Sequence, residues 1–173
     1  MCLPHEPYKI EREWIHAGLR CAVTQAREAE HRCGYVRVPP GHPLYGAEYG
    51  ADSVDSLRAH GGINFSEIEP RTEHEDGQGW WFGFDCGHAG DCRYDPNRDL
   101  EKLSPKTREM FEYMEKHTPM LLRGFVGFGP EHYWTQPEVE AEVERLADQL
   151  AEVWQKAELE SAGAALKEAL KCQ

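Results

Sequence analysis

The chain has 173 residues, and because a domain commonly spans about 100 to 200 residues, we expect a single domain over residues 1–173. Hydrophobic residues make up 40% and aromatic residues 10% of the chain, which is enough apolar surface for a core and excludes full disorder. The 31 acidic residues outnumber the 19 basic ones and leave a net charge of -12. This charge argues against direct nucleic-acid binding through a broad basic face and favours a small ligand or a basic partner.

The chain carries no readable targeting or membrane signal. It has no run of about 18 apolar residues, and its N-terminal segment lacks a basic stretch followed by an apolar one. The sequence therefore predicts a cytoplasmic protein without a membrane span. Its six cysteines are too few for a disulfide scaffold and none has CxxC spacing, so we expect reduced thiols and no zinc site made of cysteines alone.

The first predicted element is a short amphipathic helix over residues 7–17, because Ile10 and Trp14 are four residues apart and Gly18 follows as a C-cap. Strands are predicted where β-branched and aromatic residues lie between turn residues. The predicted strands cover residues 19–24, 33–39, 61–68 and 80–85. Gly83, inside the last of them, predicts a bulge or the close approach of another backbone.

The connection over residues 39–51 is rich in Pro, Gly, His and Tyr and shows no periodicity. We expect an ordered loop whose prolines restrict the backbone, and such loops often carry sites. Tyr45 in this loop is a candidate for stacking on a ligand.

Helices are predicted in the C-terminal half. One covers residues 104–118, which begin with Ser-Pro and end before a proline, and another begins at Thr135, where Glu138 completes a capping box. A last amphipathic piece covers residues 160–170. An apolar stripe on the helix that begins at Thr135 is expected to pack on the sheet: Val139, Val143, Leu146, Leu150, Val153 and Trp154. These elements predict an α+β fold, an antiparallel sheet of about four strands covered by N-terminal and C-terminal helices.

The C-terminal helices, residues 135–171, are acidic. Between Glu138 and Glu160 the chain carries eight acidic residues and only two basic ones, Arg145 and Lys156. This face is either a solvated helix surface, whose first-turn acids are favoured by the helix dipole, or an acidic surface for a basic partner protein.

Several strings resemble a group of small proteins encoded by bacteriophages and their bacterial hosts. They are CGYVRVPPGHPLYG at residues 33–46, HGG at 60–62, WWFGFDCGHAGD at 80–91 and ERLADQL at 144–150. The resemblance implies a phage or prophage origin, a location in the host cytoplasm and an accessory role such as anti-defence, but it brings no activity and no catalytic residue. The chain departs from the group at residues 92–133, which we interpret as an insertion.

The residues with the most chemistry flank the last two predicted strands. His60 precedes one strand, and Asp85, His88 and Asp91 lie at the end of the other. If the two strands pair antiparallel across residues 69–79, the start of one lies beside the end of the other, so these side chains share one edge of the sheet. Because imidazole and carboxylate ligands suit divalent ions such as Zn, Mn or Ni, these four residues are candidate metal ligands.

A second hypothesis for the same edge is a ligand pocket. The backbone N–H groups of the glycine-rich turns at residues 60–62 and 87–90 would approach an anion closely, with a histidine or Arg37 adding charge. No Walker or GxGxxG spacing is present, and positive φ in a turn explains the same glycines. The candidate ligand-binding residues are His60, Gly61, Gly62, Asp85, His88, Asp91, Arg37 and Tyr45.

A third hypothesis makes Cys33 or Cys86 a nucleophile beside a histidine, although a small buried cysteine flanking a strand explains both residues more simply.

Three functions are therefore open at this point. The first is a phage accessory protein that binds a small polar ligand, such as a nucleotide, between His60 and His88. The second is a metal-assisted or acid/base hydrolase that uses the same residues. The third is an inhibitor that presents the acidic helical face to a basic host protein.

Overall fold

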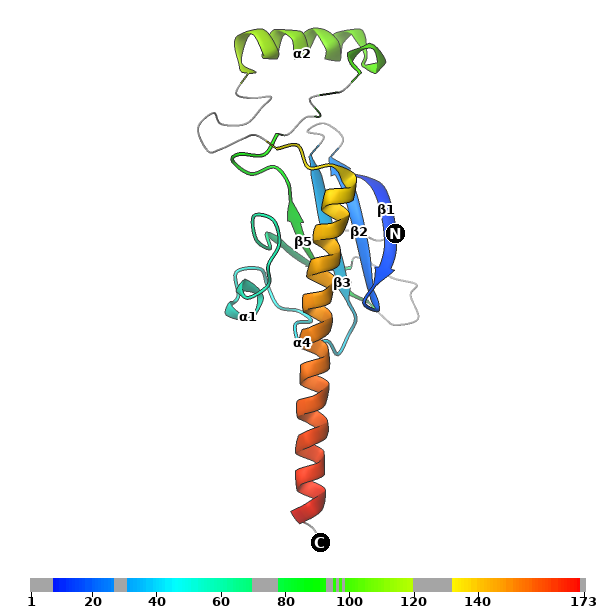
Figure 1. Ribbon diagram of the computed structural model, residues 1–173, viewed down its shortest axis with the longest axis vertical. Coiled ribbons are helices and arrows are strands. Elements are labelled where there is room, and N and C mark those ends of the chain that lie inside the picture. The colour runs from blue at the N-terminus through cyan, green and yellow to red at the C-terminus, as the bar shows by residue number, and fades with distance from the viewer. Residues whose placement is uncertain are drawn as a thin grey trace.

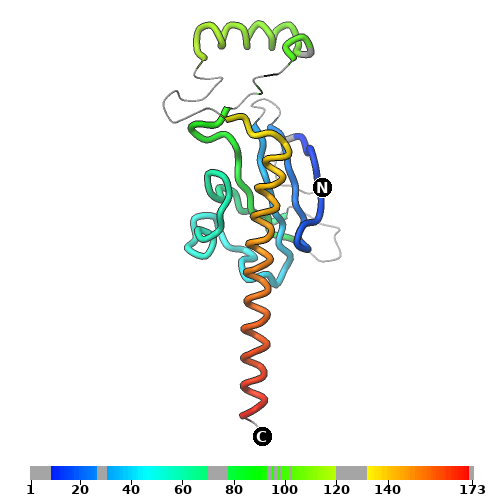
Figure 2. Tube along the Cα trace, in the orientation of Figure 1, coloured from blue at the N-terminus to red at the C-terminus, as the bar shows by residue number. Residues whose placement is uncertain are grey.

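The computed structural model describes residues 8–26, 31–69, 78–92, 95, 97, 99–119 and 132–171. Its centre is a five-stranded antiparallel sheet in the order β1-β2-β3-β5-β4, so the predicted α+β class is confirmed. One long helix, α4, crosses a face of this sheet (Figure 1), and Figure 2 shows its C-terminal part projecting past the strands. The strands are β1 (Tyr8–His16), β2 (Leu19–Ala26), β3 (Arg32–Val38), β4 (Phe65–Ile68) and β5 (Trp80–Asp85). The helices are α1 (Asp52–Asp55), the 3₁₀ helix η1 (Leu100–Lys102), α2 (Pro105–His117) and α4 (Gln136–Lys171).

The N-terminal segment is a strand, so the predicted N-terminal helix is wrong and the sheet has five strands where about four were expected. Ile10 and Trp14 are four residues apart, a spacing that fits one face of a helix and also one face of a regular strand. In β1 a register shift between Ile10 and Arg12 places them on opposite faces, with Trp14 toward the core. The turn between β1 and β2 decides between helix and strand, because Ala17 has φ 48° and Gly18 has φ 80°. Positive φ at both central residues is typical of a two-residue hairpin turn. The glycine that resembles a helix cap is therefore half of a β-turn.

The other predicted strands are present, with ends shifted by up to two residues except in β4, which is half as long as predicted. β5 has the predicted bounds, whereas β4 begins at Phe65 and not at Gly61. Gly61 and Gly62 have φ of 67° and 88°, which a strand cannot accommodate, so the residues before β4 form a loop. Gly83 accommodates a close approach as predicted: a Cβ there would meet the ring of Tyr35 at 2.5 Å and the backbone carbonyl oxygen of Gly34 at 3.1 Å.

The main core lies between the sheet and α4. The predicted stripe on α4 faces the sheet, and four of its members are fully buried: Val139, Val143, Leu146 and Leu150. Val153 and Trp154 are partly buried against the same core. Gly34 of β3 allows a close approach of the helix, because an added Cβ there would lie 2.5 Å from Val143. At the start of the helix, Glu138 accepts hydrogen bonds from the backbone N–H and hydroxyl of Thr135, which is the predicted capping contact.

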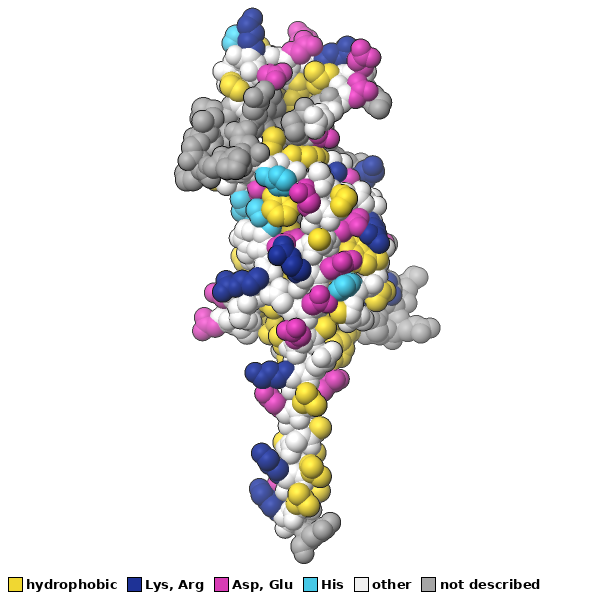
Figure 3. All heavy atoms as spheres, viewed as in Figure 1, with side chains coloured by type: hydrophobic (Ala, Val, Ile, Leu, Met, Phe, Trp, Pro, Cys, Tyr) yellow, Lys and Arg dark blue, Asp and Glu magenta, His cyan; other side chains and the backbone are white. Residues whose placement is uncertain are grey.

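The last 14 residues of α4, 158–171, project beyond the core (Figure 2). α4 is one continuous helix of 36 residues, where the sequence predicted a break between two pieces. All residues from 158 to 171 are exposed, including Leu159, Leu166 and Leu170. Figure 3 shows hydrophobic side chains along this projecting part.

The segment interpreted as an insertion, residues 92–133, is described only in part. Within it, α2 begins and ends as predicted, with the Ser104 hydroxyl accepting a hydrogen bond from the Thr107 N–H and Thr118 as its C-cap. Residues 120–131 lie outside the described residues.

The loop over residues 39–51 packs on α4 through a buried histidine. The Nδ1 atom of His42 accepts a hydrogen bond from the Leu44 N–H at 3.1 Å, and its Nε2 donates to the carbonyl of Leu150 at 3.0 Å. Both contacts are satisfied by a neutral imidazole with its proton on Nε2. Burial lowers the pKa of His42, because the protonated ring would lose its hydration there. This loop has a packing role.

We expect Leu146→Ala to lower the free energy of unfolding by about 2 to 5 kcal/mol, the usual range for emptying a buried leucine site. Urea denaturation of the two proteins measures the change. The exposed Leu166→Ala is the matched control and is expected to shift stability by less than about 0.5 kcal/mol. If Leu146→Ala lowered the free energy of unfolding as little as Leu166→Ala does, α4 would not form the core.

We expect acid to destabilise the fold partly through His42. Because the folded-state pKa of His42 is below the unfolded value of roughly 6.5, the unfolded chain binds more protons in this range, and stability falls as the pH drops below that value. The slope from this one group is at most about 1.4 kcal/mol per pH unit. Between pH 7.5 and 5, the free energy of unfolding should fall more steeply with decreasing pH for the natural chain than for His42→Gln. Glutamine keeps an N–H donor for the Leu150 carbonyl and does not titrate. Equal slopes would contradict the role of His42.

Candidate functional site

The predicted site is assembled by the antiparallel pairing of β4 with β5. Phe65 pairs with Gly83 and Ile68 with Trp80, so the chain before β4 lies beside the chain after β5. The Asn64 N–H extends this pairing by donating to the carbonyl of Gly83, and its side-chain amide reaches the Asp85 carboxylate. The pairing predicted across residues 69–79 is thus confirmed.

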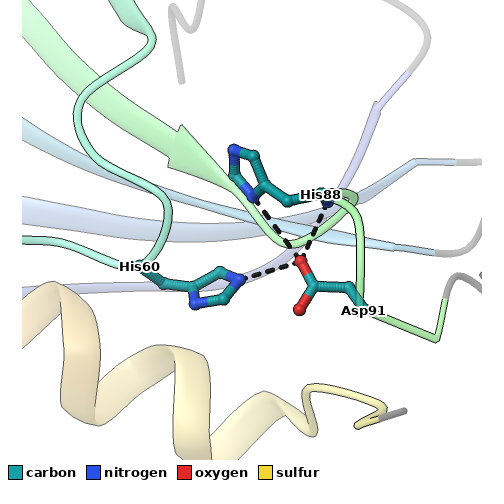
Figure 4. Close-up of side chains that lie close together, drawn as sticks. All are labelled: His60, His88 and Asp91. Carbon is teal, nitrogen blue, oxygen red and sulfur yellow. Dashed lines mark hydrogen bonds and ion pairs between the residues drawn. The ribbon is translucent and has the colours of Figure 1, made fainter. Parts of the chain in front are cut away.

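The centre of the site is the carboxylate of Asp91, which is only 5% exposed. Its Oδ2 atom accepts hydrogen bonds from Nε2 of His60 at 2.8 Å and from the backbone N–H of His88 at 2.9 Å. Its Oδ1 atom accepts from the indole N–H of Trp134 at 3.0 Å. Figure 4 shows both imidazoles turned toward this carboxylate from different loops. The structure therefore brings three of the four predicted metal ligands together.

The ring of His88 has one nitrogen with no hydrogen-bond partner among the described residues. Its Nδ1 atom is buried and lies 3.5 Å from Oδ2 of Asp91, in a geometry that makes no hydrogen bond. One ligand atom each from His60, His88 and Asp91 lie within 4.8 Å of one another. Three such atoms this close together can share one metal ion.

Gly61 positions the ring of His88. With φ 67°, Gly61 turns its Cα face toward the imidazole, and a Cβ there would lie 2.1 Å from Cε1 of His88. Gly62 has φ 88° but nothing within 4 Å of the corresponding position. Both positions favour glycine because of their positive φ. At Gly61 the close contact with the His88 ring is a second reason, because it leaves no room for a Cβ.

Asp85, the fourth predicted ligand, lies beside this cluster and not within it. Its Oδ1 atom is 3.9 Å from Nδ1 of His88 and accepts a hydrogen bond from the Gly87 N–H at 2.8 Å. Its Oδ2 atom accepts from the side chain of Asn64. These two donors hold the carboxylate next to the His88 ring.

Trp134 belongs to the site although the sequence does not point to it. Its ring stacks on His60 with centroids 4.2 Å apart, and its N–H holds Asp91. His132, two residues before Trp134, pairs with the chain at Asp91. The Cys92 N–H donates to the His132 carbonyl, and the His132 N–H donates to the Gly90 carbonyl. Trp134 is 43 residues from Asp91, and no spacing or composition signal links the two segments.

Arg37 and Tyr45 are separated from this cluster, which corrects their predicted place in the ligand site. Arg37 is buried and pairs through Nε with Glu69 at 3.0 Å. It lies toward the opposite end of β3, opposite Trp81 of β5, whereas Cys33 lies opposite Asp85. The hydroxyl of Tyr45 donates to the carbonyl of Gln78, just before β5. Neither side chain is at the edge that carries His60 and His88.

The cysteines are placed as structural residues. Cys86 is buried, and burial, followed by the charges of Asp91 and other neighbours, raises the pKa of its thiol. A thiol that stays protonated is a weak nucleophile. Cys33 is buried with Tyr35 and Trp81 in the smaller apolar cluster of the sheet. The structure thus favours the packing interpretation of both residues.

The acidic face of α4 is partly neutralised within the chain. Glu140 pairs with Arg12 of β1, and Asp148 lies 2.8 Å from His16, which also approaches Glu144. These contacts dock the N-terminal hairpin against the first half of α4. They favour a structural role for these acids over a free surface for a basic partner.

Comparison with protein-family models, curated proteins and solved structures finds no match for this chain. The resemblance to the phage group is therefore still a prediction. Among the described helices, none is both long enough and apolar enough to cross a membrane.

We expect Gly61→Ala to displace the ring of His88, and Gly62→Ala to leave it in place. Both variants place alanine at positive φ and should lose roughly 1 to 2 kcal/mol of stability for that reason. The readout is therefore the NMR signals of the His88 ring, assigned with a His88→Gln variant. A ring signal that shifts equally in both variants would contradict the contact between Gly61 and His88.

Proposed function

We propose that the chain binds one divalent transition-metal ion, of which zinc is the first candidate, through His60, His88 and Asp91. A small polar ligand then completes the coordination of the metal. The observation that carries this proposal is that one ligand atom each of His60, His88 and Asp91 lie within 4.8 Å of one another, with Nε2 of His60 and Nδ1 of His88 both facing Oδ2 of Asp91.

The distances between these atoms fit a metal ion. Zinc bonds to nitrogen and oxygen of about 2.0 to 2.2 Å in a tetrahedron put neighbouring ligand atoms about 3.4 Å apart. In the structure, Oδ2 of Asp91 is 2.8 Å from His60 Nε2 and 3.5 Å from His88 Nδ1. A metal ion would replace the proton between His60 and Asp91, and the two imidazoles, whose ligand atoms lie within 4.8 Å of each other, would close around it.

The charges of the site also favour a cation. Asp91 is buried, and a buried carboxylate is costly unless a positive charge or several hydrogen bonds compensate it. Asp85 adds a second carboxylate beside His88. The indole N–H of Trp134 and the backbone N–H of His88 orient Asp91, in the way that outer hydrogen bonds orient the ligands of a metal.

Three protein ligands leave room for an exchangeable one. This agrees with the first function expected from the sequence, the binding of a small polar ligand between His60 and His88. Metal-assisted hydrolysis is the second candidate, because catalytic zinc sites also have three protein ligands and one open position for water. An accessory role in phage infection rests on the sequence resemblance alone.

We expect the purified full chain to bind about one zinc ion per molecule after chelation and reloading, as measured by elemental analysis and calorimetry. His88→Ala should weaken binding at least about 100-fold, because it removes a ligand and not only an outer contact. His117→Ala, which changes an exposed histidine on α2, is the matched control and should bind like the natural chain. Zinc binding that is absent from the natural chain, or unchanged by His88→Ala, would overturn the proposal.

A further inference from the structure

We propose that Asp85 makes this site select uncharged ligands and reject anions such as phosphates and carboxylates. The ligand is then a neutral nitrogen or oxygen donor and not a nucleotide held by its phosphates. This inference rests on the metal binding proposed above and names the class of ligand that the metal accepts.

Three backbone N–H groups of the glycine-rich turns are already engaged within the chain, two of them by its own carboxylates. The Gly87 N–H donates to Oδ1 of Asp85, and the His88 N–H donates to Oδ2 of Asp91. The Gly62 N–H donates to the carbonyl of Ala59. The turn at residues 87–90, one of the two that predict a phosphate site, thus serves to hold Asp85 and Asp91.

The guanidinium groups of the two arginines of β3 are also engaged elsewhere. Arg32 forms two contacts with the Glu11 carboxylate and donates to the Tyr133 hydroxyl and the Trp134 carbonyl. Arg37 pairs with Glu69 in the interior. Sites that bind phosphate usually direct such cations at the ligand. Neither arginine is placed to do so here.

Asp85 acts through its charge and its fixed position. Its Oδ1 atom is 3.9 Å from the metal-facing nitrogen of His88, and the donors from Gly87 and Asn64 keep it there. A divalent ion together with the carboxylates of Asp85 and Asp91 has no net charge. An incoming anion therefore gains little long-range attraction and is repelled by Asp85 at short range. A neutral ligand is not repelled, and a hydrogen on its metal-bound atom can be accepted by Asp85.

The test uses the full chain loaded with Co²⁺, whose visible spectrum reports the fourth ligand, and two probes, imidazole and inorganic phosphate. Imidazole should bind the natural chain, and phosphate should not bind at millimolar concentration. Asp85→Asn keeps an oxygen for the Gly87 N–H, and the amide of Asn64 can turn to pair with it, so this variant should fold. It should bind phosphate at least about 10-fold more tightly and imidazole within about 3-fold of the natural chain, since only the charged probe senses the lost carboxylate.

Asp148→Asn is the matched control, because it removes one negative charge from α4 in the same chain, at a residue paired with His16. It should behave like the natural protein. Phosphate binding that is equally tight in the natural chain and in Asp85→Asn would overturn the proposal. Failure of imidazole to bind would also overturn it, and loss of cobalt from Asp85→Asn would show that Asp85 is a ligand. Failure of the natural chain itself to hold cobalt would instead overturn the proposed metal site.

Discussion

The buried carboxylate of Asp91 is the constraint on which the site depends. It takes hydrogen bonds from three segments: His60 from the loop before β4, His88 from the loop after β5, and Trp134 from the chain leading into α4. A carboxylate removed from water needs these donors, because an unpaired one costs several kcal/mol, on the order of the stability of a whole domain. Satisfying this one group fixes the relative positions of three loops.

The rest of the fold serves to bring these loops to Asp91. The β4–β5 pairing places the His60 loop beside the His88 loop, and the packing of α4 at Gly34 positions the segment that carries Trp134. The hairpin of β1 and β2 is tied to α4 through Arg12 and His16. Burial against the sheet stabilises only the first half of α4, and the exposed second half continues a helix already nucleated there.

The proposed metal site and the proposed ligand specificity rest on different features of the same loops. The convergence of two imidazoles and one carboxylate favours a cation, and the carboxylate of Asp85 beside them disfavours an anion. A pattern of glycines and histidines is compatible with either ligand at the level of sequence. The direction in which the Gly87 and His88 N–H groups point favours the neutral ligand, since both groups donate to the protein's own carboxylates.

The sequence alone determined those features that depend on local periodicity and on the order of segments along the chain. The apolar stripe of α4, the bounds of β5 and the pairing of β4 with β5 are of this kind, and the pairing was enough to predict that His60, His88 and Asp91 meet. The N-terminal strand was missed because a four-residue spacing fits both helix and strand, and only a partner strand resolves it. The place of Trp134 in the site and the exclusion of Arg37 from it were decided by tertiary structure. Each depends on a contact between segments far apart in the chain, Trp134 with Asp91 and Arg37 with Glu69. Such contacts have no local signature: the free energy that selects them comes from burying charge and apolar surface together in the folded chain.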